Sequence, residues 1–172
     1  MTSRARRVSD EPTAGPARSV LAVAALAVLV NGGLALIGGD SRGVEQHFSS
    51  VFAPPGWLVG GVWIVLFGLL GLARWRLARS GSEAGRQGAR WAMAFVVVCA
   101  LYPVYTLGLR SLTAGFVGNV GTALFAVFVG LQVMRIDSLS AGVFALVVAW
   151  LCYATFAIAA QLGWLPVWGW WL

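Results

Sequence analysis

Five long apolar segments, separated by one long connection at about residues 39–54 and by shorter charged ones, constrain the fold of this chain more than any other feature. We expect them at residues 19–38, 55–78, 88–109, 112–135 and 139–163. Each segment reaches the roughly 20 residues with which a helix crosses the hydrocarbon core of a bilayer. A helix also satisfies its own backbone hydrogen bonds, which lipid cannot do. The sequence therefore predicts an all-α membrane protein, folded as a single bundle of five transmembrane helices.

Composition and charge agree with a membrane location. The chain is 59% hydrophobic and only 10% charged, and a soluble domain could not bury that much apolar surface. Its net charge of +6 comes from arginines alone, and these border the apolar segments. Arginines in such positions are typical of topology signals. We therefore expect the lipid bilayer, and no nucleic acid, as a partner.

The arginines also predict an orientation. Four lie within residues 4–18, five within 74–90, and Arg135 joins them on the same side, which makes ten. The opposite side has two, Arg42 and Arg110. By the positive-inside rule, a bacterial plasma-membrane protein of this kind has a cytoplasmic N-terminus and an external C-terminus. Residues 1–17, which are polar, are predicted to form a disordered cytoplasmic tail.

Residue patterns for catalysis or metal binding are missing. The single histidine, His47, falls in the connection between the first two segments, and the segment interiors carry no ionisable carboxylates. Cys99 and Cys152 lie within apolar runs, without the grouping that a metal site needs. We therefore expect no catalytic residue and no metal site, so an enzyme is less expected than a binding protein.

Aromatic and small residues recur at helical spacing on three of the expected helices. The second helix carries Trp57, Gly60, Gly61, Ile64, Gly68 and Gly71; the third carries Trp91, Phe95, Tyr102 and Tyr105; the fifth carries Trp150, Tyr153, Ala157, Gln161 and Trp164. Small residues let neighbouring helices approach closely. Aromatic walls with a few polar groups suit flat apolar ligands. Helix packing and a ligand pocket both remain open as explanations.

Polar side chains inside the apolar segments need partners. Gly115, Asn119 and Thr122 fall together on the fourth helix, which indicates hydrogen bonding to another helix. We expect Asn31 or Gln161 to orient the polar edge of a ligand.

One segment is specific enough to indicate a family. It contains Pro54-Pro-Gly-Trp57, then Gly60-x-Val-Trp63, then Leu66-Phe67-x-Leu69-x-Gly71. This pattern resembles the tryptophan-rich sensory protein family, also called the translocator protein or peripheral benzodiazepine receptor family. The run from Trp150 to Gln161 is similar to the family's fifth helix, although the polar identities differ. Phe52 stands where the family usually has a tryptophan.

The resemblance implies a pocket among the first, second, third and fifth helices, closed by the outward connection. Its implied lining residues are Phe52 on the lid and Trp57, Trp63, Tyr102, Tyr105, Trp150 and Tyr153 on the walls. The family binds porphyrins, sterols and synthetic drugs. We therefore expect a sensor or carrier for a flat apolar ligand such as a tetrapyrrole or a sterol-like molecule, with no cofactor other than such a porphyrin.

Two alternatives stay open. Some members of the family are linked to light-dependent porphyrin breakdown in which indoles take part, and Phe52 removes one such indole. The other alternative is a ligand-free membrane scaffold that acts through helix–helix dimerisation, with the glycines of the second helix at a homodimer interface.

Overall fold

The computed structural model describes residues 15–36, 54–109 and 111–165 of the chain. Within these ranges the chain forms five helices and no strand. They are α1 (Pro16–Leu36), α3 (Gly56–Arg79), α4 (Glu83–Leu109), α5 (Leu112–Met134) and α6 (Ser138–Gln161). The predicted all-α fold with five helices is confirmed.

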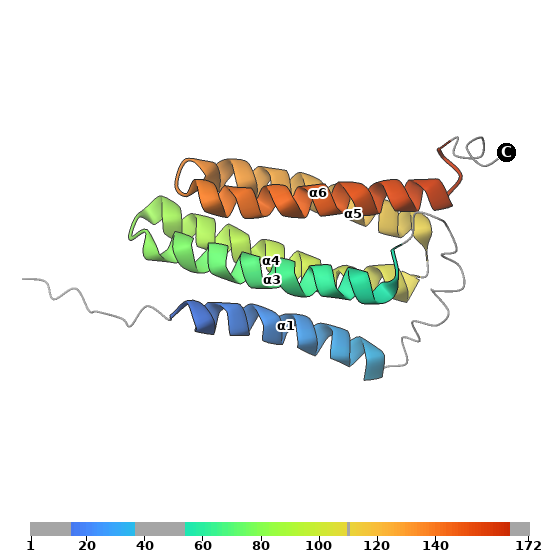
Figure 1. Cartoon of the computed structure of the whole chain (residues 1–172), viewed down its shortest axis with the longest axis horizontal. Helices are drawn as coiled ribbons and strands as arrows, with labels where there is room; N and C mark the ends of the chain where they lie inside the picture. The colour runs from blue at the N-terminus through green and yellow to red at the C-terminus, as the bar shows by residue number, and fades with distance from the viewer. Residues whose placement is uncertain (1–14, 37–53, 110, 166–172) are drawn as a thin grey trace, which may run out of the picture.

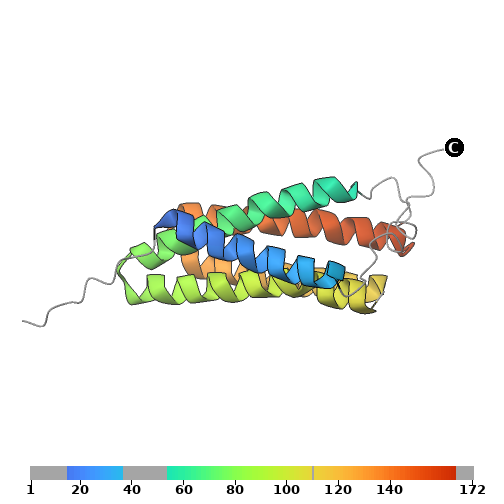
Figure 2. The ribbon, with the colours of Figure 1, turned by 90° about the horizontal axis from the view of Figure 1, so that it is seen from below.

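The helices run along one common direction as a single bundle (Figure 1). α1 packs on α3 and α4, α3 packs on α6, and α5 fills the space between α4 and α6. The α3–α4 and α5–α6 turns lie at the same end as the start of α1, and both views show this (Figures 1 and 2). We call it the arginine end, because it carries Arg18, Arg74, Arg76, Arg79, Arg86, Arg90 and Arg135.

Local signals set where several helices begin and end. The side chains of Ser111 and Asp137 cap α5 and α6, accepting backbone N–H groups of Ala114 and Ser140. α6 ends in a Schellman motif, in which Gly163 has φ 71° and its N–H bonds the carbonyl of Ala160. These short-range contacts explain why the expected limits of α5 and α6 differ from the observed ones by two residues at most.

Two expected boundaries are wrong. α4 begins at Glu83 rather than at residue 88, because the Ser82 hydroxyl accepts the Gly85 N–H at 2.9 Å and starts the helix within the charged segment. α1 begins at Pro16, inside the segment predicted to be a disordered tail. Proline suits the first turn of a helix, since its missing N–H would have no partner there. Residues 1–14 of that tail lie outside the described residues.

An aromatic cluster forms the middle of the bundle. The Phe95 ring of α4 lies 5.6 Å from the Phe125 ring and 5.5 Å from the Phe144 ring, edge to face in both cases. Trp91 meets Phe125 and Phe128 edge-on. Phe95 and Phe144 are fully buried. The first half of the predicted aromatic stripe on α4 therefore packs against α5 and α6.

The outer surface of the bundle is apolar. α3, α5 and α6 are each long and apolar enough to cross a membrane. In α1 the apolar stretch Pro16–Leu29 is shorter, and α4 starts with Glu83, Arg86 and Arg90 in its first two turns. Large apolar side chains such as Leu124 are exposed along the helices. A surface of this kind fits a lipid environment, so the chain is an integral membrane protein.

The contact between α1 and α3 depends on one glycine. A Cβ on Gly71 would lie 2.9 Å from the Val20 Cα and 3.2 Å from the Ser19 carbonyl oxygen. Arg74 adds a hydrogen bond of 3.0 Å from its guanidinium to the Ser19 hydroxyl. Close backbone approach and a polar tie therefore hold the N-terminal half of α1 against α3.

Candidate functional site

A groove of about 560 Å³ lies between α3 and α6. Its walls are almost entirely apolar. They are formed by Leu58, Val62, Val65, Leu66 and Leu69 of α3 and by Leu146, Ala149, Trp150 and Tyr153 of α6. We call it the α3–α6 groove.

The α3–α6 groove opens to the outside of the bundle. Its rim residues Val65 and Leu146 are 60% and 55% exposed, whereas Leu66 at its floor is 5% exposed. Since the outer surface faces lipid, an apolar molecule could reach the groove directly from the bilayer.

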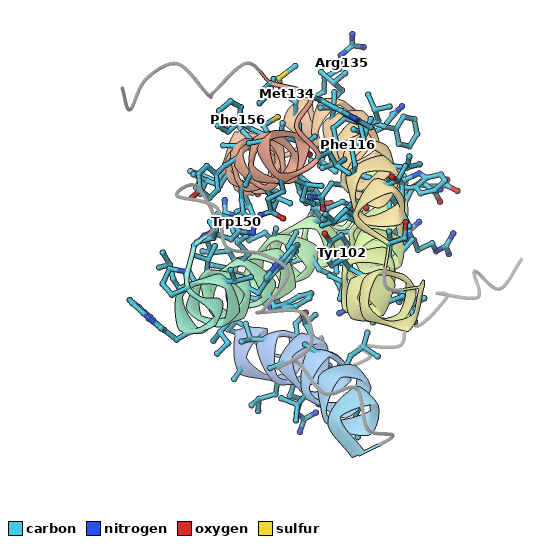
Figure 3. The ribbon with its side chains drawn as sticks, turned by 90° about the vertical axis from the view of Figure 1, so that its right-hand side faces the viewer. Tyr102, Phe116, Met134, Arg135, Trp150 and Phe156 are labelled. Carbon is cyan, nitrogen blue, oxygen red and sulfur yellow. The ribbon has the colours of Figure 1, made fainter. Side chains whose placement is uncertain are left out.

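Two aromatic rings form one wall of the groove. The Trp150 and Tyr153 rings have centroids 5.6 Å apart and planes tilted by 35°. Figure 3 places Trp150 in the seam between α6 and α3. A smaller hollow of about 280 Å³ continues along α3 to Trp57, which is 78% exposed. The structure thus brings Trp150 and Tyr153 together, with Trp57 at the border of the adjoining hollow.

The remaining predicted lining residues lie elsewhere or outside the described part of the chain. Trp63 packs against the buried Phe67 ring at 5.4 Å, on the core side of α3. Tyr102 is partly buried on the inner side of α4 (Figure 3). Phe52 lies outside the described residues. Asn31 and Tyr105 belong to α1 and α4, but their side chains are not among those described.

Two buried amides have atoms without a hydrogen-bond partner among the described residues. These atoms are Asn119 Nδ2 and Gln161 Oε1. The sequence predicts that Asn119 and Thr122 form hydrogen bonds to another helix. The Thr122 hydroxyl instead donates to the Gly118 carbonyl of its own helix at 2.7 Å. Gln161 lies at the end of α6, eight residues beyond Tyr153, and so about 12 Å further along the helix.

The glycines of α3 do not form one packing face, which corrects the prediction. A Cβ on Gly60, Gly61 or Gly68 would meet no atom of the described structure within 4 Å, and only Gly71 on this face touches another helix. Ile64, between them, is 75% exposed. The reason is that α1 crosses α3 near Gly71 and leaves the outer half of this face open.

At the arginine end, an ion pair joins α3 to the N-cap of α6. Arg76 Nε and Nη2 donate to the two Asp137 carboxylate oxygens at 2.8 and 2.9 Å. Asp137 also accepts from the hydroxyl and the N–H of Ser140. Hydrogen bonding to Arg76, with support from Ser140, holds the pKa of the Asp137 carboxyl well below its usual range.

Sequence reasoning missed the aliphatic part of the groove. Leu58, Val62, Val65 and Leu69 follow helical spacing on α3, but its other faces are apolar too. No contrast between polar and apolar faces therefore marked them. The one usable signal was that they share a helix face, which says nothing of which helix stands opposite.

The described residues contain no group of three or more His, Cys, Asp or Glu side chains that could hold a metal ion.

Comparison with known proteins gives one family. The model of the TspO/MBR family matches residues 19–165, which is most of the chain. No curated protein and no solved structure matches.

Proposed function

The chain belongs to the TspO/MBR family, whose members are generally membrane ligand-binding sensors, and on this premise we propose that it binds a flat apolar ligand as a sensor or carrier. The ligand class is a porphyrin or another tetrapyrrole, or a sterol-like molecule. The observation that carries the proposal is the α3–α6 groove with the Trp150–Tyr153 pair in its wall.

The groove has a suitable size and lining. Small-molecule sites commonly measure about 300–1,000 Å³ and combine apolar walls with a few polar groups. The groove falls within this range. The indole N–H of Trp150 and the hydroxyl of Tyr153 are the side-chain polar groups of its lining, and the rest are Leu, Val and Ala. A planar ring system with few polar atoms matches such walls best.

Binding from lipid would rest on packing and ring contacts. A ligand that leaves the bilayer gains little from the hydrophobic effect, since lipid tails are as apolar as the groove. Close contact with the aliphatic floor supplies dispersion energy. Aromatic pairs add about 0.5–1.5 kcal/mol beyond the buried area. The proposal therefore predicts an affinity that depends strongly on shape and on Trp150 and Tyr153.

Gln161 would hold the polar edge of the ligand. Its Oε1 is buried without a partner among the described residues, and a carboxylic acid or hydroxyl group could donate to it. The distance of about 12 Å along α6 from Tyr153 matches a ligand whose ring system lies in the groove and whose polar edge points toward the end of the helix.

Titration with protoporphyrin IX in lipid nanodiscs tests the proposal. Ala149→Phe should fill the groove and weaken binding at least tenfold, measured by quenching of tryptophan fluorescence. Ala145→Phe is the matched control, because Ala145 is exposed one turn earlier on α6 and does not line the groove. Equal affinities of the two variants would contradict the groove as the binding site.

An experiment on the complex with protoporphyrin IX distinguishes a binding protein from a porphyrin-degrading enzyme. Illumination in air followed by mass spectrometry should return the porphyrin unchanged if the chain is a sensor or carrier. Loss of the porphyrin in wild type, but not in Trp150→Phe, would favour the light-dependent enzyme.

A further inference from the structure

The arginine end carries a large uncompensated charge. Its seven arginines face two acidic residues, Glu83 and Asp137, among the described ranges, which leaves a formal charge of +5. Both views of the bundle place the helix ends that carry these residues together (Figures 1 and 2). Charge of one sign at one end of a membrane bundle favours an anionic partner at that level.

Neutral groups surround most of these arginines. Arg76 is paired with Asp137, and no other described arginine has a described carboxylate oxygen within 4.0 Å. Arg86 donates to the Gly81 carbonyl at 3.2 Å, and Arg90 donates to the Gln87 side-chain carbonyl at 3.4 Å. These acceptors satisfy single N–H groups but leave the positive charges unbalanced.

Arg86 and Arg90 form an exposed pair of like charges within this end. They lie one helical turn apart on α4, and both are exposed. Like charges at this spacing repel each other on a helix. A phosphate between them would relieve the repulsion, since a guanidinium presents a planar fork of donors that matches phosphate oxygens.

The same face of α4 turns apolar further along the helix. Val97 and Leu101 lie seven and eleven residues beyond Arg90, which is two and three turns, so all three share one face. Val97 is 38% exposed and Leu101 is 45% exposed. The stretch from Arg90 to Leu101 covers about 16 Å. One leaflet of hydrocarbon is about 15 Å thick, half of the bilayer core.

We propose that this face of α4 is a binding site for one anionic diacyl phospholipid, such as phosphatidylglycerol. Arg86 and Arg90 hold its phosphate, and one acyl chain lies along Val97 and Leu101. The site is separate from the α3–α6 groove, because α4 contributes no residue to that groove. A polar surface followed by an apolar strip of leaflet length fits a lipid better than a free anion.

A tryptophan beside an arginine on α3 indicates that this end of the bundle lies at the level of the lipid headgroups. The Arg79 guanidinium lies 5.3 Å from the centroid of the Trp75 ring, a cation–π contact. Trp side chains prefer the interface between headgroups and hydrocarbon. The pair therefore marks, on α3, the same depth at which the phosphate would meet Arg86 and Arg90 on α4.

Native mass spectrometry of the delipidated full chain in a neutral detergent tests the proposal. Phosphatidylglycerol should bind at least tenfold more tightly than phosphatidylcholine with the same acyl chains. The double variant Arg86→Gln, Arg90→Gln should weaken phosphatidylglycerol binding about fivefold for each arginine replaced, the effect expected for one basic residue near an anionic surface. Equal binding of the two lipids by wild type would overturn the proposal without any variant.

Two single variants act as matched controls. Glu83→Gln removes a negative charge one turn before Arg86 on the same helix, so it should tighten phosphatidylglycerol binding. Arg135→Gln removes an exposed arginine from the end of α5, away from this face, and should change binding less than twofold. A loss with Arg135→Gln as large as that of the double variant would indicate diffuse attraction and overturn the site.

Two competitors distinguish a lipid from a free phosphate. Inorganic phosphate at a large excess should leave bound phosphatidylglycerol in place, and glycerophosphoglycerol, the headgroup without acyl chains, should bind at least tenfold more weakly than the lipid. Displacement by inorganic phosphate, or equal binding of headgroup and lipid, would show an anion site without an acyl-chain contact and would refute the proposal.

Discussion

Asp137 holds the α5–α6 turn through two kinds of contact, and replacing it separates their contributions. Its carboxylate caps α6 by accepting the Ser140 N–H at 3.2 Å, and it receives two hydrogen bonds from Arg76. The Asp137 side chain is 18% exposed, whereas that of Arg76 is 39% exposed, so water weakens the ion pair. We therefore expect the helix cap to contribute more than the charge pair.

The magnitude follows from the lost contacts. Asp137→Ala should lower the free energy of unfolding by about 1 kcal/mol from the cap alone, within the range of about 0.5–2 kcal/mol for such changes. The buried Ser140 hydroxyl also loses a 2.5 Å bond, but it keeps the Ala73 carbonyl at 3.3 Å. Arg76→Gln leaves the cap intact and should have the smaller effect.

Equilibrium unfolding in mixed micelles measures the contributions of the helix cap and of the ion pair. The cycle consists of wild type, Asp137→Ala, Arg76→Gln and the double variant. Asp137→Ala should still cost about 1 kcal/mol when Arg76 is already Gln. Asp137→Ser, which can cap a helix but cannot pair with Arg76, should recover most of the stability. If Asp137→Ala has no effect in the Arg76→Gln background, the ion pair carries the whole contribution and the reasoning about the cap is wrong.

Three further predictions concern Asp137, Gly71 and Phe144. Folding lowers the pKa of the Asp137 carboxyl. Its contribution to the free energy of unfolding is therefore complete above the ordinary aspartate pKa of about 3.9 and is lost as the pH falls below that value. Unfolding measured between pH 7 and pH 3 should show this loss of stability in wild type but not in Asp137→Ser. Gly71→Ala should lower the free energy of unfolding by about 1–3 kcal/mol, because its Cβ would collide with the α1 backbone. Gly68→Ala, whose Cβ would lie in open space, should raise it by up to about 1 kcal/mol. Equal effects of the two variants would contradict the α1–α3 contact. Phe144→Ala should cost about 3 kcal/mol through its cavity, while the exposed Leu124→Ala should change the free energy of unfolding by no more than about 0.5 kcal/mol.

The predicted homodimer and the orientation of the chain remain predictions. The open face of α3 around Gly68 could contact lipid or a second copy, and cross-linking in nanodiscs would distinguish them. The described arginines lie at one end of the bundle, and the positive-inside rule predicts that this end is the cytoplasmic one.

The nature of the fold could be predicted from the sequence because its determinants are local. Segment length and apolar content specify membrane helices whatever their neighbours are. Caps such as Asp137 and Gly163 act within one turn and mark the ends of α6. The start of α4 was misplaced because apolar content alone defined the segment, while Ser82 starts the helix in polar sequence.

The arrangement of faces was decided by the tertiary structure. In a membrane the surface is as apolar as the interior, so a helix such as α3 carries no pattern that tells its packed side from its lipid side. Trp63 packs against the core, although it was expected to line the pocket. Trp57 lies at the surface and Gly71 at the α1 contact, although helical spacing puts both on one face of α3. Segment length and composition alone specify that five helices form and that they carry aromatic side chains. Only packing between helices distant in the chain created the α3–α6 groove and joined Arg76 to Asp137.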